Sequence, residues 1–354
     1  MNKKNHGSED QEPSIHQWRQ LYASAEAFGK LEAWEWMWDS DMFGVENPED
    51  GEIGYCCVLG RNKECFSLNI YLGTEGLGTC LEVQKVGMAA IHQDVVYRQK
   101  CLMASFEDRD MVPGPDLKRI KNLGMKFRGR HQWPVLRSHR PGYFPWDVTA
   151  QEAEFMTICL DQAGQIAKRF KADPEMLFPK KEGHYFVRVP KRNNGKLEWR
   201  DDWRKPLPFK KILVVKGSVD KNRINQIMKK ASFQKKMIWE IDYFHAPMPV
   251  RDGEERPYFP IAILMVDKES LFVLNCHLTN MKKYHLELAQ QLLRAFENSG
   301  VVPGKIYVRR QEILPCFAPV ADELGVEMIV TDQLDAVDEA REGMKEFFVE
   351  QDRM

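Results

Sequence analysis

Apolar residues recur with two different periods along the first half of the chain, and each change of period marks an expected element. Helical spacing after Ser14 predicts a first helix, and a longer helix follows Thr149 and runs to Phe170. Between them, the apolar runs IGYCCVLG and CFSLNIYLG are separated by four polar residues, which is typical of a β-hairpin. The other elements expected in this α+β domain, which spans 14–178, are a helix at 79–91, a strand at 101–108 and a short helix at 116–123.

The middle of the chain, residues 179–236, alternates charged, aromatic and proline residues. HYFVRVP and KLEWRDDW flank an Asn-Asn-Gly turn and predict a second hairpin, and KPLPFKK marks the boundary that follows it. FKKILVVKG predicts a strand, and Ser218 is placed to cap a basic helix. We expect this region to be a basic hairpin and linker between two domains.

The last part of the chain, residues 237–350, has the most regular pattern. Three strand-like runs, MIWEIDYFHAP, PYFPIAILMVD and SLFVLNCHL, come first. A helix at 280–298, the strand KIYVRR, a helix at 311–324, the strand VEMIVTD and a helix capped by Asp332 follow. Together with the N-terminal pattern, this order predicts an α/β protein of two domains, preceded by a disordered tail at 1–13.

Composition restricts the classes of protein to which the chain can belong. Its 354 residues are enough for two hydrophobic cores, and 43% hydrophobic with 29% charged residues is typical of globular proteins. No apolar run approaches the roughly 20 residues of a membrane helix, and the polar start lacks the apolar stretch of a secretion signal. Eight scattered cysteines without a C-x-x-C spacing indicate reduced thiols. We therefore expect a cytoplasmic protein without membrane contact.

The opening third of the chain carries an unusual segment in which three tryptophans precede a run of carboxylates. Trp34, Trp36 and Trp38 are most simply explained as core residues, because each indole buries a large area. The acids between Asp39 and Glu52 lack the spacing of a calcium loop and indicate a solvated turn region. The histidines show no zinc-ligand spacing, so we expect no bound metal.

The order of elements after residue 237 resembles the ribonuclease-H-like fold, a mixed five-stranded sheet with helices on both faces. VPGKIYVRRQEILPCFAPVADELGVEMIV is similar to a stretch found in degenerate, transposase-related members of that group. The whole chain resembles an uncharacterised two-domain bacterial family whose N-terminal domain carries the pattern W-E-W-M…D-x-F-G-V…G-x-I-G-Y-C. The resemblance implies an architecture and brings no established activity with it.

An active ribonuclease-H-like nuclease gathers three or four carboxylates around two divalent ions. The acids placed to do this by the resemblance are Asp242, Glu287, Glu312 and Asp332, with Glu240 on the same strand face as Asp242. However, the fourth strand ends in Arg309 and Arg310, where a metal ligand would be needed. Cations at that position oppose metal binding, which favours a non-catalytic domain. A nuclease dependent on Mg²⁺ or Mn²⁺ is the alternative.

Charge is strongly segregated along the chain although the net charge is only −1. Residues 1–60 hold 12 acidic and 4 basic side chains, residues 180–236 hold 18 basic and 5 acidic, and residues 311–354 hold 12 acidic and 3 basic. A basic block with interleaved aromatics is typical of a surface that binds single-stranded nucleic acid. The residues predicted to make this contact are Lys191, Arg192, Trp199, Arg200, Trp203, Arg204, Lys210 and Lys211.

The basic block also has a simpler interpretation, in which it forms a solvated face or docks on the acidic segments of the same chain. The partner expected from the sequence is thus nucleic acid or an acidic protein surface. The function predicted is that of a non-catalytic binding or scaffold protein, with a nucleic-acid-processing enzyme as the alternative.

Overall fold

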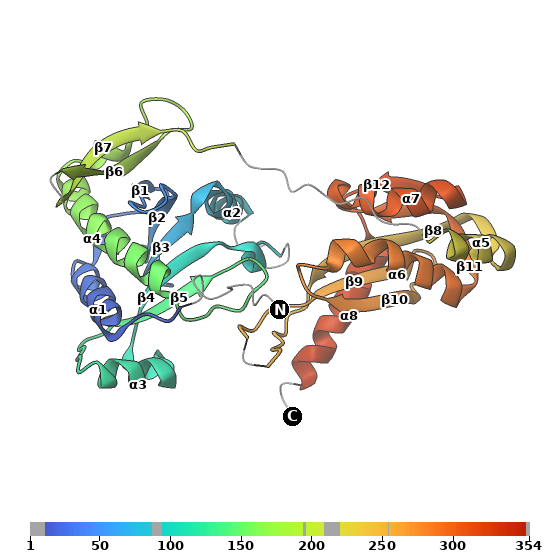
Figure 1. The fold of residues 1–354 in the computed structure, drawn as a ribbon, viewed down its shortest axis with the longest axis horizontal. Helices are drawn as coiled ribbons and strands as arrows, with labels where there is room; N and C mark the ends of the chain where they lie inside the picture. Colours follow the sequence, from blue (N-terminus) through green and yellow to red (C-terminus); the bar gives the residue numbers. More distant parts are fainter. Residues whose placement is uncertain (1–10, 87–93, 194–195, 209–219, 254, 352–354) are drawn as a thin grey trace, which may run out of the picture. The chain divides into compact units, whose positions relative to one another are not determined.

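The computed structural model describes residues 11–86, 94–193, 196–208, 220–253 and 255–351, with side chains up to Met344. The chain divides into two compact units (Figure 1). Unit 1 comprises Met1–Pro141 and Pro145–Phe209, and unit 2 comprises Gly142–Phe144 and Lys210–Met354. Each unit is built around its own mixed sheet with flanking helices, which confirms the predicted α/β class.

Unit 1 contains a seven-stranded sheet in the order β5-β4-β3-β2-β1-β6-β7. Neighbouring strands are antiparallel except β1 and β6, which are parallel. The strands are β1 (Phe43–Glu46), β2 (Ile53–Leu59), β3 (Ser67–Leu72), β4 (Cys101–Glu107), β5 (Trp133–His139), β6 (Tyr185–Asn193) and β7 (Lys196–Arg204). Its longer helices are α1 (Ile15–Gly29), α2 (Gly73–Val86), α3 (Gly114–Asn122) and α4 (Ala150–Ala172). Short 3₁₀ turns are η1 (Ala33–Glu35), η3 (Val95–Arg98), η4 (Arg109–Met111) and η5 (Pro174–Leu177).

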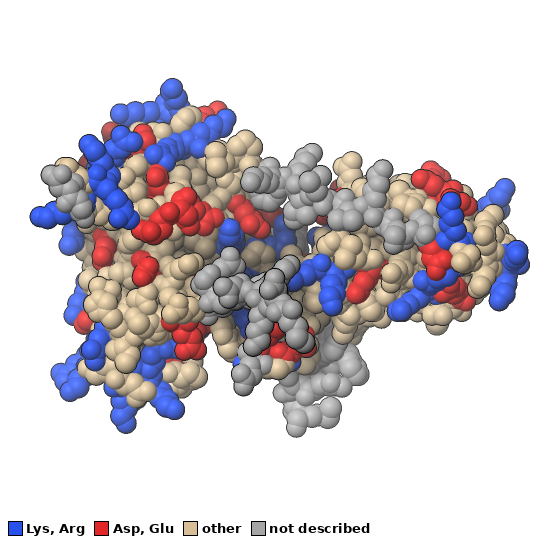
Figure 2. Space-filling model, in the orientation of Figure 1, with Lys and Arg blue, Asp and Glu red and all other residues tan. Residues whose placement is uncertain are grey.

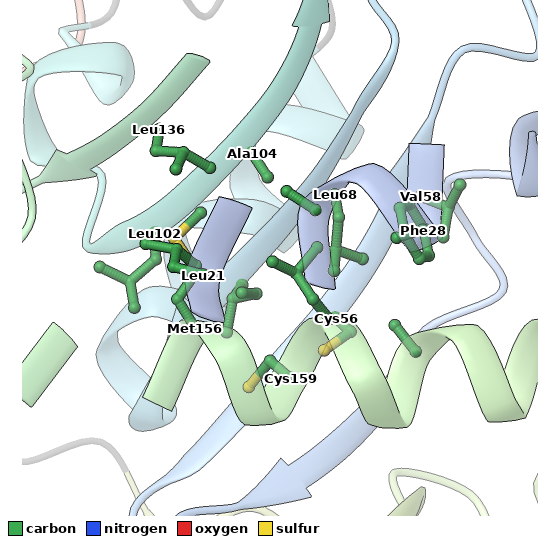
Figure 3. Packing of buried hydrophobic residues seen from close by; sticks show 14 of the residues in the cluster. Leu21, Phe28, Cys56, Val58, Leu68, Leu102, Ala104, Leu136, Met156 and Cys159 are labelled. Carbon is green, nitrogen blue, oxygen red and sulfur yellow. The ribbon is translucent and has the colours of Figure 1, made fainter. Parts of the chain in front are cut away.

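Helices α1 and α4 cover one face of this sheet and α2 covers the other. Both long helices begin at a complete capping box, with Ser14 and Thr149 as the N-caps predicted from the sequence. Side chains alternate across strand β2, so Cys56 enters the core beneath α4 next to Cys159 (Figure 3), whereas Cys57 packs on the α2 side. The two adjacent cysteines therefore belong to different cores.

The tryptophan segment that opens the sequence pattern is mainly structural. Trp34 is buried against the core, and Trp36 is half-buried and donates a hydrogen bond from Nε1 to the carbonyl oxygen of Ala167 at 3.0 Å. Trp38 remains exposed, which differs from the expected core position. In the same pattern, an added Cβ at Gly54 would lie 2.7 Å from the Ile70 side chain, so glycine is needed for close packing there.

Unit 2 contains a five-stranded sheet in the order β10-β9-β8-β11-β12. The first three strands are antiparallel to their neighbours, and β11 and β12 add in parallel to β8. The strands are β8 (Ser232–His245), β9 (Ile261–Asp267), β10 (Val273–Thr279), β11 (Val301–Val308) and β12 (Glu327–Val330). The helices are α5 (Lys221–Lys230), α6 (Tyr284–Ser299), η6 (Gln311–Ile313), α7 (Leu314–Leu324) and α8 (Asp335–Gln351).

The two faces of this sheet are covered by different helices. One core joins alternate residues of β8, such as Trp239 and Ile241, to α5, α6 and α7. A smaller core joins Phe244 and the other face of β9 to α8. The order of three strands, helix, strand, helix, strand and helix agrees with the order predicted from the sequence.

Several expected boundaries differ from those in the structure. The predicted 79–91 helix begins earlier, as α2 at Gly73. The basic helix is capped by Asp220, whose carboxylate accepts hydrogen bonds from the backbone N–H groups of Asn222 and Arg223, instead of by Ser218. Ser218 and the predicted strand at 209–217 lie outside the described residues. The second hairpin, expected as part of a linker, forms strands β6 and β7 of the unit 1 sheet.

Candidate functional site

Asp242 lies near the end of β8 with its carboxylate between two guanidinium groups. Arg309 Nη1 donates to Oδ2 at 3.2 Å, and Arg310 Nε donates to Oδ1 at 3.3 Å. The Asp242 side chain is 1% exposed. Both arginines directly follow β11, which runs parallel to β8, so the strand pairing brings them to the carboxylate. We call Asp242, Arg309 and Arg310 the unit 2 clamp.

Each arginine of the unit 2 clamp has a further partner that fixes its orientation. Arg309 Nη2 donates to both carboxylate oxygens of Asp338 on α8, at 2.8 and 2.7 Å. Arg310 donates to the backbone carbonyl of Tyr243 at 3.3 Å, and its guanidinium carbon lies 4.3 Å from the centre of the Tyr243 ring. The two cations therefore occupy the space beside Asp242 with defined contacts on both sides.

Burial dominates the electrostatics of this carboxylate. Loss of solvation raises the pKa of Asp242, although the charges of Arg310 and Arg309 act in the opposite direction. The hydrogen bonds at 3.2 and 3.3 Å are long for charge-assisted pairs, which are commonly about 2.7–2.9 Å. The fold thus encloses this carboxylate with cations that compensate its charge incompletely.

Glu240 shares the strand face of Asp242 but has a structural role. Its carboxylate is fully buried and accepts hydrogen bonds from the backbone N–H groups of Ala336 and Val337 at 2.9 and 3.2 Å. Lys268 Nζ donates to the other oxygen at 2.5 Å. A carboxylate from β8 therefore caps the first turn of α8, which begins at Asp335 instead of after a capping Asp332.

The other acids predicted as metal ligands have separate positions. Glu287, on α6, contacts His277 Nε2 at 2.7 Å. Burial acts to raise the pKa of Glu287, but hydrogen bonds from His277 and Thr279, together with nearby positive charge, lower it overall. Glu312 and Asp332 are exposed at the start of η6 and in the loop before α8. Among the described residues, no three His, Cys, Asp or Glu side chains have the geometry to hold a metal ion.

The β6–β7 hairpin separates its aromatic residues from its free cations. Antiparallel pairing places Phe186 opposite Trp203, and their rings meet edge to face at 5.8 Å. Trp199 and Trp203 both pack against the unit 1 core. Arg200 follows Trp199 along β7 and therefore points to the opposite face of the sheet. By the same alternation Lys191 and Arg204 lie on the face of Arg200, whereas Arg192 lies on the face of Trp199.

Several hairpin arginines pair with acids of unit 1. Arg192 contacts Glu49 at 2.7 Å, and Arg204 contacts Glu46. Both partners belong to the acidic segment near the start of the chain, as in the alternative interpretation of the basic block. Lys191 and Arg200 are exposed. The remaining predicted contacts, Lys210 and Lys211, lie outside the described residues.

A second cationic surface surrounds α3 and was not identified from the sequence. The segment from Leu117 to Trp146 contains eight lysines and arginines and no acidic residue, which is the signal that could have revealed it. Lys and Arg side chains gather where α3 lies and again over the hairpin (Figure 2). Beside α3 the surface is hollowed into a pocket of about 1000 Å³.

Comparison with known families gives architecture without an activity. Residues 18–188 match the family described as Domain of unknown function (DUF7309). Residues 223–345 match the family described as Domain of unknown function (DUF6930). The two matches support the predicted two-domain family of unknown function. No curated protein matches the chain. None of the helices in the described part of the chain has the length and apolar character to cross a membrane.

Proposed function

We propose that the protein is a non-catalytic nucleic-acid-binding protein whose unit 2 is a degenerate ribonuclease-H-like domain. The strand order of unit 2 and the placement of its helices on both faces support this likeness. The observation that carries the non-catalytic assignment is the unit 2 clamp. A divalent ion at Asp242 would have to displace two guanidinium groups that are themselves held by Asp338 and Tyr243.

The alternative of a metal-dependent nuclease requires several carboxylates that converge on one point. Asp242 contacts arginines, Glu240 caps α8, and Glu287 contacts His277. These acids therefore have other partners, and at Asp242 the arginine side chains already occupy the place that a metal ion would need. The geometry favours the binding protein over the nuclease.

Nucleic-acid contact is supported by exposed cations of the hairpin and its end that form no ion pair with the described residues. Lys191, Lys196, Arg200 and Lys205 are exposed, and none of them contacts an acid of the described residues within 4.0 Å. Cations in this state can exchange mobile counterions for phosphates, which gives salt-dependent binding. Arg192 and Arg204 would first have to leave Glu49 and Glu46.

The non-catalytic part is tested by incubating the full chain with labelled single-stranded and duplex DNA and RNA in Mg²⁺ or Mn²⁺. We expect no cleavage above the level given by Asp242→Asn, because neither protein can hold the ions needed. Asp322→Asn, an exposed acid on α7, is the matched control. Metal-dependent cleavage by the wild-type chain and by Asp322→Asn, lost in Asp242→Asn, would establish the nuclease instead.

The binding part is tested by the retention of the same nucleic acids as the salt concentration rises. We expect measurable binding at low salt that weakens steeply with added salt. A fourfold alanine variant of Lys191, Lys196, Arg200 and Lys205 should bind less tightly if the hairpin contributes. Absence of all binding by the wild-type chain at low salt would reject the nucleic-acid assignment.

A further inference from the structure

The pocket beside α3 is bounded by three consecutive parts of unit 1. These are η4, the exposed side of α3 with the loop after it, and the start of β5. Its volume is about 1000 Å³, and it is open to solvent. The lining includes five lysines and arginines, the helix residues Leu117 and Ile120, and the rings of Phe127 and Trp133. The pocket thus combines cations with apolar and aromatic groups on one surface.

Four of the lining cations carry uncompensated charge. Lys118, Lys121, Lys126 and Arg128 are exposed, and no carboxylate of the described residues lies within 4.0 Å of their charged nitrogens. Lys118 and Lys121 are three residues apart on α3, so they stand on neighbouring positions of one helix face. A negatively charged chain passing over α3 can meet both at once.

The acidic residues that flank this segment in the sequence already pair with arginines. Asp116 is buried and receives hydrogen bonds from Arg119 and Arg137, and Asp147 contacts the same two arginines. Arg119 lies over the ring of Trp18, on the side of α3 that faces α1. The arginine on the inner side of α3 is therefore paired within the folded unit. The cations on its outer side have no such partner among the described residues and can bind an external anion.

The acidic residues near η4, on the other side of the pocket, also have partners or lie outside the lining. Asp108 accepts a hydrogen bond from the backbone N–H of His131 at 2.9 Å, which lowers its pKa, and Arg130 lies 3.6 Å away. Asp110 is exposed on η4 and is not part of the pocket lining. Five lining cations, including Arg109, therefore face a pocket lined by no carboxylate.

The aromatic part of the pocket is a half-buried indole that is supported by a buried phenyl ring. Phe127 is buried and meets the ring of Trp133 edge to face at 5.9 Å, which fixes the indole from beneath. Trp133 itself is half-buried, and the Arg109 guanidinium carbon lies 5.7 Å from its ring centre. A flat base that takes the place of the Arg109 guanidinium over the indole would bring its phosphates toward the lysines.

We infer that this pocket binds single-stranded nucleic acid, with Trp133 as a base platform and Lys118, Lys121, Lys126 and Arg128 as phosphate contacts. The inference deepens the proposed function, on which it rests, by naming the surface and the form of the ligand. A single strand fits because its bases are free to leave the stack and lie on an aromatic ring. The body of a duplex offers phosphates to the same cations, but its stacked bases have no accessible face except at the two ends.

The experiment measures the affinity of the full chain for a labelled single-stranded oligonucleotide and for the duplex of the same sequence. Alanine at Lys118, Lys121, Lys126 and Arg128 should weaken single-strand binding by on the order of 100-fold at low salt. It should also reduce the slope of log affinity against log salt by about 3, from four lost phosphate contacts at roughly 0.7 each.

A matched control removes three lysines and one arginine elsewhere on the exposed surface. Arg19, Lys85, Lys168 and Lys235 serve this purpose, because all are exposed and the net charge change is the same. We expect this variant to bind almost as the wild type does. An equal loss of affinity in both variants would show that overall charge, and not the pocket, determines binding.

The stacking role is tested with Trp133→Leu, which keeps an apolar side chain against Phe127. Single-strand affinity should fall about tenfold, while duplex affinity stays nearly constant. Thermal unfolding of each variant confirms that it is folded. Equal losses for both forms, or none for single strands, would reject the platform.

The outcomes separate this inference from the proposed function. Wild-type binding that is lost only in the fourfold hairpin variant, with the α3 variants unaffected, would overturn the pocket and leave nucleic-acid binding intact. No binding by the wild type would overturn both.

Discussion

Each unit contains a buried aspartate that accepts hydrogen bonds from two arginines, and the hydrogen bonds are shorter in unit 1 than in unit 2. In unit 1, Asp116 is 1% exposed and receives hydrogen bonds from Arg119 at 2.9 Å and from Arg137 at 3.0 and 2.5 Å. In the unit 2 clamp, Asp242 is equally buried, but the corresponding distances are 3.2 and 3.3 Å. In both clusters one or both arginines also contact an exposed aspartate, Asp147 in unit 1 and Asp338 in unit 2.

The comparison shows that a clamped aspartate is not by itself the remnant of an active site. The unit 1 cluster fastens the start of α3 to β5, and no sequence pattern suggests catalysis there. In the unit 2 clamp the two arginines compensate Asp242 only in part, since burial raises its pKa although both cations lie close to it.

The largest expected effect is the difference between Asp116→Asn and Asp242→Asn. Asp116→Asn should lower the free energy of unfolding by about 3–5 kcal/mol, because it removes one side of a short, buried ion pair. Asp242→Asn should have a smaller effect, because burial raises the pKa of Asp242, so the ionised carboxylate loses more in solvation than it gains from its two arginines.

These values can be measured by urea unfolding combined with hydrogen exchange that resolves the two units. Asp322→Asn serves again as the exposed control and should leave both units unchanged. A larger loss from Asp242→Asn than from Asp116→Asn would show that distance is a poor guide to the strength of these clusters.

The pH dependence of Asp242 should be opposite in sign to that of Asp201 in unit 1. Asp242 has a raised pKa, so its contribution to stability is complete below the unfolded value and is lost as pH rises through the folded value. Hydrogen bonds from Arg169 and Arg188 lower the pKa of Asp201, so its contribution is present above the unfolded value and is lost as pH falls.

Carboxyl-carbon NMR titration should therefore find Asp242 above the ordinary aspartate value of 3.8 and Asp201 below it. In unfolding experiments, the wild type should lose stability relative to Asp242→Asn as pH rises from that value. A titration of Asp242 below the ordinary value would mean that its arginines outweigh burial.

The smallest expected effects come from the exposed ends of the two clusters. Asp147→Asn and Asp338→Asn should each lower the free energy of unfolding by about 0.2–1 kcal/mol, because half-exposed ion pairs are screened by water. Asp147 should have the larger effect, since it contacts two arginines and Asp338 contacts one. Added salt should shrink both effects, and a salt-independent loss would point to a packing change instead.

Periodicity and capping were sufficient to predict most of the fold. The capping boxes at Ser14 and Thr149 and the succession of strands and helices along unit 2 depend on neighbouring residues, so the local sequence contains them. The cap of α8 could not be predicted in this way, because Glu240 reaches Ala336 only after the sheet and helix have packed. Asp332 had the usual residue type for a cap, and a more distant carboxylate took that position.

The candidate site was predictable only in part for the same reason. A parallel strand ending in two arginines placed Arg309 and Arg310 near Asp242, as the structure shows. That Asp338 would complete the cluster depends on how α8 lies over the sheet. On the hairpin, counting aromatic and basic residues ignored their alternation, and β pairing then put Trp199 and Arg200 on opposite faces.

The capping of α8 by Glu240 has a consequence for synthesis of the chain. Ribosomes that stop before Leu334 would release a β8–β9 surface whose apolar side chains Phe244 and Leu264 have lost their cover, together with a carboxylate that has no amide groups to satisfy. Such truncated products should aggregate and be degraded readily. The burial of Glu240 therefore depends on the last helix of unit 2 being present.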